Sequence, residues 1–233
     1  YMVVADVARG DGSDYSTAQV IDIEDSSQVA EYRGKIDTKD FGNFLVSLST
    51  EYNNALLIVE NSNVGWATIQ QCIDRGYGNL FYMSQDLKYI DVERQLSNKY
   101  WREEKKMVAG FSTTVKTRPL IISTLDTYIN NKDILIRSSR LIDELFTFIW
   151  NGGRAEAMKN YNDDLTMALA IGLWVRNTAL RLKQEGIDLT KNMLNAATVK
   201  QYEGIVTTNH LKRNPYEMDL GRGEKENLTW LIG

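Results

Sequence analysis

The sequence has little of the chemistry on which many enzymes and secreted proteins depend. Its 233 residues include one cysteine, Cys72, and one histidine, His210. A single cysteine excludes an internal disulfide and favours a reducing, intracellular setting. A single histidine excludes a histidine-based metal site, and a Ser-His-Asp triad would depend on His210 alone. No apolar run reaches the roughly 20 residues of a membrane-spanning helix, and no signal peptide is recognisable, so we expect neither a membrane partner nor secretion.

The composition is that of an ordinary globular protein, with 43% hydrophobic residues, 25% charged residues and a net charge of −4. The first sixty residues carry few basic side chains, whereas the stretch from Lys99 to Arg118 is basic and aromatic. An acidic region beside a basic, aromatic one is expected of a metal-dependent enzyme that holds a polyanion. A solvated surface with ordinary Lys/Glu pairs explains the pattern equally well.

Hydrophobic patterns in the first part of the chain predict a mixed sheet flanked by helices. Two apolar runs enclose a polar turn with Gly10 and Gly12, which is typical of a β-hairpin. Asp37 is placed to cap a helix, and the continuous apolar run 55–59 is typical of a strand buried on both faces. The expected elements are strands at 2–6, 15–23 and 28–36, a helix behind Asp37, a strand at 55–59, a helix at 65–75 and a strand at 79–84.

The second part of the chain begins with a stretch that fits this pattern poorly. Residues 85–114 interleave aromatic and basic side chains, and we interpret them as an insertion or a projecting hairpin. Beyond it we expect a helix at 119–130, a short strand at 134–136, a helix at 140–146 capped by Ser138 or Ser139 and a hairpin over 146–159. An apolar helix capped by Asn162 or Asp163 should follow and reach Leu182. Residues 185–233 give a weaker pattern, one more helix followed by a polar tail.

Carboxylates occur at three informative places in this scheme. Asp6 lies in the first strand, where a buried acid is costly unless a charge opposes it, so it is either a turn acceptor or a ligand of a metal ion or phosphate. Glu60 ends the buried strand 55–59. Asp163 and Asp164 lie in the first turn of the late helix, where ordinary capping is the alternative interpretation. Hard Mg²⁺ prefers such oxygen ligands, which suits a chain so poor in histidine and cysteine.

Three stretches, 4–16, 59–65 and 162–169, resemble the nuclease domain of large terminase subunits, most closely those of T-even-type tailed phages. The resemblance extends from Tyr1 to about Lys183. It implies an α/β, ribonuclease H-like fold, with a mixed central sheet flanked by helices and a basic hairpin inserted at 85–114. It places the nuclease domain at 1–184, followed by a C-terminal helix and tail at 185–233. It also implies an N-terminal ATPase domain outside this sequence, and no Gly-x-x-x-x-Gly-Lys-Ser/Thr loop occurs here.

The resemblance also assigns the site. It implies that Asp6, Glu60 and Asp164 are catalytic and that, together with Asp163, they bind two divalent ions, Mg²⁺ or Mn²⁺. We favour Asp164 over Asp163 as the main ligand because it lies one position deeper in the helix. Asp11 and Asp14 are candidate outer ligands acting through water, or simply turn residues. Many relatives have a further acid at the position of Met167, so one ligand is missing here.

The implied activity is an endonuclease that cuts concatemeric viral DNA in headful packaging. Its implied partners are double-stranded DNA, the portal protein, the small terminase subunit and the ATPase domain of the same chain, in the host cytoplasm. Candidate DNA contacts are Trp101, Arg102, Lys105, Lys106, Lys116 and Arg118. Two other classes stay open: a non-catalytic ribonuclease H-like scaffold, and an actin- or sugar-kinase-like ATPase, which would need a second Gly-rich phosphate hairpin.

Overall fold

The computed structural model describes residues 1–84 except 13 and 63, residues 107–181, residues 184 and 187, and residues 217–221 and 224–227. The chain divides into two compact units, Tyr1–Leu182 and Lys183–Gly233. In the second unit the described residues form an antiparallel pair, β9 (Glu217–Gly221) and β10 (Glu224–Asn227), which the polar pattern of the tail did not predict. The helix expected at the start of this unit lies outside the described residues.

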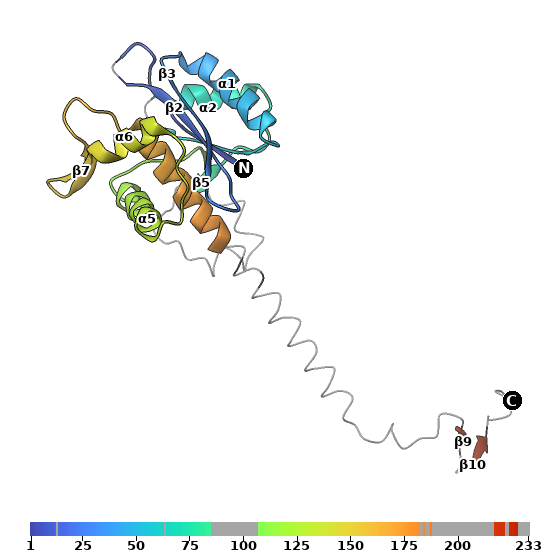
Figure 1. Cartoon of the computed structure of the whole chain (residues 1–233). Helices are drawn as coiled ribbons and strands as arrows, with labels where there is room; N and C mark the ends of the chain where they lie inside the picture. Colours follow the sequence, from blue (N-terminus) through green and yellow to red (C-terminus); the bar gives the residue numbers. More distant parts are fainter. Residues whose placement is uncertain are drawn as a thin grey trace. The chain divides into compact units, whose positions relative to one another are not determined.

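A four-stranded mixed sheet forms the centre of the first unit (Figure 1). Its strands are β1 (Met2–Asp6), β2 (Ser16–Ile21), β3 (Gln28–Gly34) and β4 (Leu56–Val59), in the order β3-β2-β1-β4. β1 is antiparallel to β2 and parallel to β4, with Ala5 opposite Val59. Because β1 and β4 run the same way, Asp6 and Glu60 come at the same edge of the sheet.

Helices cover both faces of this sheet (Figure 1). α1 (Thr38–Glu51) and α2 (Gly65–Asp74) lie on one face, and the predicted cap is confirmed, since Asp37 accepts hydrogen bonds from Lys39 and Asp40. α5 (Thr117–Asn131), α6 (Ser139–Thr147, capped by Ser138) and an apolar helix of residues 164–181 lie on the other. The mixed sheet flanked by helices is therefore confirmed.

Alternation along the central strands divides the core into two layers. Met2 and Val4 of β1 and Ile58 of β4 pack with the 164–181 helix, α5 and α6. The intervening residues Val3 and Ala5 pack with α1 and α2 instead. All of these side chains are buried, as expected for strands covered on both faces.

Part of the stretch expected to project as an insertion belongs to the core instead. β5 (Tyr82–Ser84) pairs with β6 (Met107–Ala109), and the Phe111 amide donates to the Val59 carbonyl at 2.8 Å. The Phe111 ring is fully buried and packs edge-on against Trp174. Phe111 therefore belongs to the hydrophobic core and not to an exposed aromatic and basic surface. Residues 85–106 of the expected insertion lie outside the described residues.

The region after α5 differs from expectation in one detail. The strand predicted at 134–136 is reduced to a single bridge between Leu135 and Ser27. The predicted hairpin is present as β7 (Phe148–Asn151) and β8 (Arg154–Ala157).

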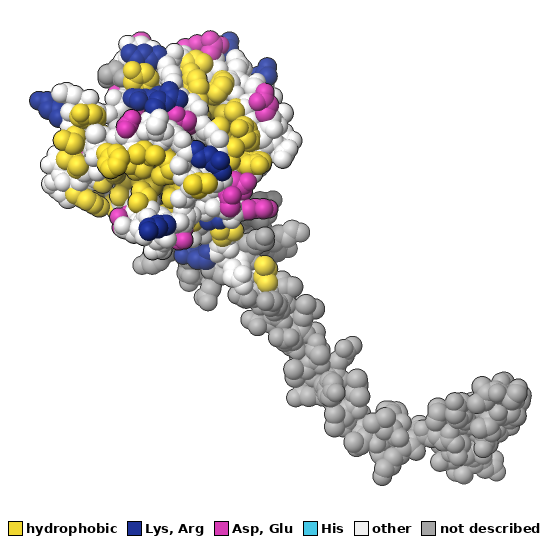
Figure 2. Space-filling model, in the orientation of Figure 1, with side chains coloured by type: hydrophobic (Ala, Val, Ile, Leu, Met, Phe, Trp, Pro, Cys, Tyr) yellow, Lys and Arg dark blue, Asp and Glu magenta, His cyan; other side chains and the backbone are white. Residues whose placement is uncertain are grey.

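An apolar hollow of about 490 Å³ opens between α5, α6 and this hairpin, and the hydrophobic area over these elements is visible in Figure 2. Its lining includes Ile129, Phe146 and Trp150. None of the described helices is both long enough and apolar enough to cross a membrane.

Candidate active site

Asp6 and Glu60 meet at the edge of the sheet because of strand register. Asp6 follows Met2 and Val4 in the alternation of β1, and Glu60 follows Ile58 in β4, so both acids lie on the face covered by the 164–181 helix. The Glu60 amide extends the ladder by donating to the Ala5 carbonyl at 2.9 Å. The two acids are therefore neighbours on adjacent strands, and the charge of Glu60 acts on Asp6.

The turn after β4 fixes Glu60 from the other side. Ser62 donates to Glu60 Oε1 at 3.3 Å. A Cβ added at Gly65 would lie 1.9 Å from the Glu60 carbonyl oxygen, so only glycine lets α2 begin so close to this residue. Buried Asn61 supports the same turn by donating to the Ala109 carbonyl and accepting from Ser112.

The electrostatics at Asp6 are those of crowded carboxylates. Burial raises the pKa of Asp6 well above its ordinary value, and the nearby charge of Glu60 raises this pKa further. The charges of Asp164 and Asp163 add to the effect. The sheet edge and the start of the late helix are therefore close enough to interact, and the four predicted acids form one cluster.

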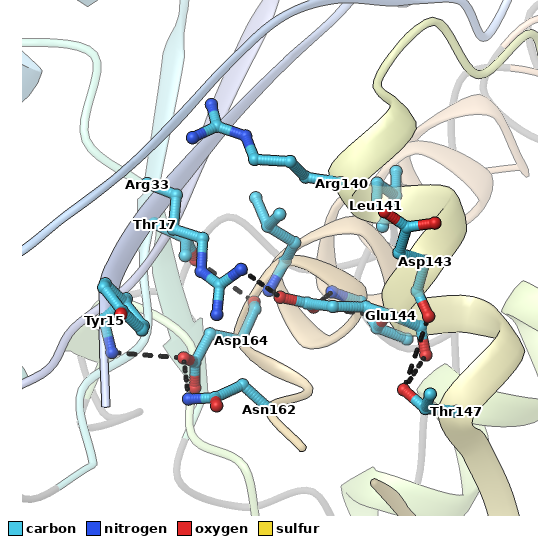
Figure 3. A network of polar contacts seen from close by, with 12 residues as sticks. Tyr15, Thr17, Arg33, Arg140, Leu141, Asp143, Glu144, Thr147, Asn162 and Asp164 are labelled. Carbon is cyan, nitrogen blue, oxygen red and sulfur yellow. Dashed lines mark hydrogen bonds and ion pairs between the residues drawn. The ribbon is translucent and has the colours of Figure 1, made fainter. Parts of the chain in front are cut away.

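Asp164 begins the late helix and is held by main-chain and side-chain donors (Figure 3). Its Oδ2 accepts hydrogen bonds from the Tyr15 amide at 3.2 Å and from Asn162 Nδ2 at 3.1 Å. Thr17 Oγ1 donates to the Asp164 carbonyl oxygen at 3.1 Å. Burial raises the pKa of Asp164, whereas the two donors to its carboxylate oppose that rise. The helix start is thus tied to β2, which lies beside β1 and Asp6.

A buried acid caps the same helix from α6. Glu144 Oε2 accepts from the amides of Leu165 at 2.9 Å and Thr166 at 3.1 Å, and Arg33 lies 3.8 Å from Glu144 Oε1 (Figure 3). Arg33 also stacks on the Tyr15 ring at 4.2 Å. Burial raises the pKa of Glu144 to about 7, although the amides and Arg33 lower it. Glu144 therefore fixes the end of the helix that carries Asp164.

Asp163 is already engaged by a cation. Arg118 Nη2 lies 2.8 Å from Asp163 Oδ2, and the same guanidinium donates to the Ala155 carbonyl. Arg118 is thus placed inside the site rather than on an open surface, which is not the placement expected of a simple phosphate contact. Asp163 and Asp164 therefore have different surroundings, the first paired with an arginine and the second with neutral donors.

Only some of the other predicted site residues lie near the carboxylates. Asp14 lies near enough for its charge to raise the pKa of Asp164, whereas Asp11 forms an exposed pair with Arg9 at 3.8 Å. Met167 is buried in the core layer under the sheet. Lys116 is exposed just before α5. The remaining candidate DNA contacts, Trp101, Arg102, Lys105 and Lys106, lie outside the described residues.

The donor set fits a hard divalent cation, although no three histidine, cysteine, aspartate or glutamate side chains within the described ranges are already spaced to hold a metal. Asp6 and Glu60 offer oxygen ligands on adjacent strands, and like charges crowded in a partly buried place are what a cation offsets. Asp164 would contribute a third carboxylate. Asp163 would have to exchange its arginine.

Comparisons with solved structures identify a fold. The chain is similar to the large terminase nuclease of thermophilic phage G20c solved with magnesium, with a TM-score of 0.55 and 18% identity over 74% of this chain and 79% of that one. The same nuclease with cobalt gives a TM-score of 0.54 at 18% identity, again over 74% and 79% of the two chains. The nuclease domain of the Thermus phage P74-26 large terminase gives 0.50 at 19% identity, over 73% and 76%.

This chain has the fold of those nuclease domains. No protein-family model matches the sequence, and a search of curated proteins returns no match.

The residues that sequence reasoning missed are those that support the acids. Tyr15, Thr17, Arg33 and Glu144 were not among the candidates, although all contact the start of the late helix or the groups that cap it. A usable signal was present in β2, where polar Thr17 alternates with apolar Ala18 in a strand that had to be buried. Glu144 gave no such signal, because an acid in an amphipathic helix normally faces solvent.

Proposed function

We propose that this chain is a metal-dependent nuclease whose site is the cluster of Asp6, Glu60 and Asp164. The observation that carries the proposal is the placement of Asp6 and Glu60 on adjacent parallel strands, within reach of the charge of Asp164, in the fold of terminase nuclease domains. Neighbouring structures of that fold were solved with magnesium and cobalt, which supports a divalent ion as the cofactor.

Each residue of the site has a separate proposed role. Asp6, Glu60 and Asp164 would hold one or two divalent ions, and the bound metal would supply activation of a water and stabilisation of the leaving oxygen of a phosphodiester. The Tyr15 amide and Asn162 orient the Asp164 carboxylate. Ser62 and the backbone contact to Ala5 orient Glu60. Because these contacts hold the carboxylates in place, the site needs little reorganisation during the reaction.

The finer proposal concerns the biological substrate. We assign to the chain an endonuclease activity on double-stranded DNA with little sequence preference, in headful packaging of a tailed phage of the T-even type, with two Mg²⁺ or Mn²⁺ ions. The portal protein, the small terminase subunit and an ATPase domain would be its partners, in the host cytoplasm. The three sequence stretches that resemble terminases and the shared fold support this assignment.

Cleavage of supercoiled plasmid tests the proposal. The wild-type chain is expected to nick and linearise plasmid with Mg²⁺ or Mn²⁺ and to stop when EDTA is added. Asp6→Asn and Glu60→Gln are expected to lower the rate at least about 100-fold, since the metal supplies several kcal/mol and a factor of ten corresponds to about 1.4 kcal/mol. Asp126→Asn, an exposed acid on α5, is the matched control and should keep wild-type activity.

Equal activity of Asp6→Asn and Asp126→Asn would contradict the site. A folded wild-type chain that cuts no plasmid with either metal would favour the non-catalytic scaffold instead.

A further inference from the structure

Arg118 lies beside the proposed active site but has no role in the reaction described above. Its side chain is 17% exposed, and its partner Asp163 is 27% exposed. Arg118 Nε and Nη2 donate to the Ala155 carbonyl at 3.3 and 3.0 Å, and Nη2 also reaches Asp163 Oδ2 at 2.8 Å. The neutral carbonyl fixes the guanidinium plane, and the fixed plane presents a full positive charge to Asp163.

Asp163 belongs electrostatically to the carboxylate cluster. Its charge contributes to the raised pKa values of both Asp6 and Asp164. Arg118 is therefore a built-in counter-charge at the margin of the site. A divalent ion that used Asp163 as a ligand would compete with this guanidinium for the same carboxylate.

A second anion can resolve that competition. Guanidinium groups bind phosphate oxygens as well as carboxylates, in the same forked geometry. A phosphodiester that reached the site would offer Arg118 an alternative partner and so free Asp163 for the ion. Binding of the metal and binding of the nucleic-acid backbone would then favour each other.

We propose that Arg118 is a positioning residue that holds Asp163 away from the divalent ion until a backbone phosphate takes the guanidinium. This proposal rests on the proposed function, because it concerns the same carboxylate cluster. It gives the two neighbouring aspartates separate roles: Asp164 is a permanent ligand, and Asp163 is a conditional one. A purely structural role, in which Arg118 only ties α5 to β8 and the late helix, is the alternative.

Isothermal titration with Mn²⁺ in the absence of DNA distinguishes the two roles. Arg118→Gln is expected to bind Mn²⁺ more tightly than wild type, on the order of tenfold, which is within the range of ordinary coupling between sites. Arg118→Lys should lie between them, because an ammonium has no planar fork. Arg154→Gln, an exposed arginine next to Ala155, makes the same change in net charge and should bind as wild type.

A double-mutant cycle removes the general effect of charge. In an Asp163→Asn background, Arg118→Gln should change Mn²⁺ affinity by less than about twofold, because the competition acts through Asp163. Anisotropy of a labelled DNA duplex adds the second half of the proposal. Ca²⁺ should tighten duplex binding by wild type, and this tightening should be lost in Arg118→Gln.

The outcomes separate the inference from the proposed function. Mn²⁺ affinities of Arg118→Gln and Arg118→Lys equal to wild type, with both variants folded by circular dichroism, would overturn the role of Arg118 and leave the nuclease site intact. An equal gain in Mn²⁺ affinity from Arg118→Gln in the wild-type and Asp163→Asn backgrounds would also overturn it. Absence of Mn²⁺ binding by wild type and every variant would overturn the metal site itself, and this inference with it.

Discussion

At the scale of single residues, the decisive feature is the crowding of two acids on neighbouring strands. Burial and the negative charge of Glu60 raise the pKa of Asp6, so the ionised form of Asp6 is disfavoured in the metal-free protein. A divalent cation would offset this conflict of like charges, so the arrangement that weakens the metal-free protein is the one that prepares it for a metal.

This conflict gives the metal-free fold a defined pH dependence. The pKa of Asp6 is higher in the folded chain than in the unfolded one, so the folded chain binds more protons between the two values and loses stability as the pH rises through that interval. Asp6→Asn removes the titrating group. In EDTA we expect Asp6→Asn to melt at a higher temperature than wild type at neutral pH, with a difference that shrinks toward about pH 4.

Thermal melts followed by circular dichroism across this pH range are the measurement. Asp126→Asn serves again as the exposed control and should follow wild type at every pH. A wild-type melting temperature that rises with pH relative to Asp6→Asn would contradict the electrostatic account of the pair.

At the scale of elements, the late helix depends on a cap supplied by another helix. Glu144 of α6 accepts from the amides of Leu165 and Thr166, which the helix itself leaves without partners. Glu144 is only 6% exposed, so few waters can replace it. The position of Asp164 is therefore set jointly by β2, through Tyr15 and Thr17, and by α6.

Loss of this cap should cost stability in proportion to the hydrogen bonds removed. Glu144→Ala leaves two buried amides unpaired and is expected to lower the free energy of unfolding by about 1–3 kcal/mol. Glu144→Gln keeps an acceptor oxygen and should cost less, because the pKa of Glu144 is raised to about 7 and the neutral form is already accessible. Urea unfolding measures both variants.

Asp143→Ala is the matched control for that experiment, since this neighbour on α6 is exposed. Equal destabilisation by Asp143→Ala and Glu144→Ala would show that the cap contributes nothing.

The elements also show what the sequence could predict. Periodicity placed the strands and helices of the first 84 residues because each has one clear apolar pattern, and Asp37 marked its helix start by local chemistry. The 107–111 segment was misjudged, because its burial depends on contacts with Val59 and Trp174 from distant parts of the chain. The pairing of Arg118 with Asp163 joins residues 45 positions apart, and no local pattern encodes it.

At the scale of the whole molecule, the fold brings together acids that are far apart in sequence. Parallel pairing of β1 and β4 places Asp6 beside Glu60, and the core layer beneath them directs the late helix toward the same edge. At 18% identity to the G20c nuclease, few side chains are shared, so the common arrangement of layers is what the similarity records. The chain carries a net charge of −4, which leaves little general attraction for DNA.

Binding to DNA should therefore depend strongly on salt. For a protein that binds DNA through phosphate contacts, the logarithm of the binding constant falls linearly with the logarithm of the salt concentration, with a slope near −0.9 per phosphate neutralised. We expect a steep slope for a labelled duplex of random sequence with Ca²⁺ present, and the same slope for different sequences, because backbone contacts carry no sequence information. Anisotropy titrations at several salt concentrations measure it. Binding that is insensitive to salt would contradict a phosphate-based interface.

The position of a bound metal ion decides whether Asp6, Glu60 and Asp164 form the active site. Crystals soaked with Mn²⁺ give an anomalous scattering signal that marks the ion without assumptions about its ligands. We expect at least one strong peak between the carboxylates of Asp6, Glu60 and Asp164, and loss of that peak in Asp6→Asn crystals. A wild-type chain that cleaves DNA with Mn²⁺ but shows its only peaks away from these three residues would place the active site elsewhere.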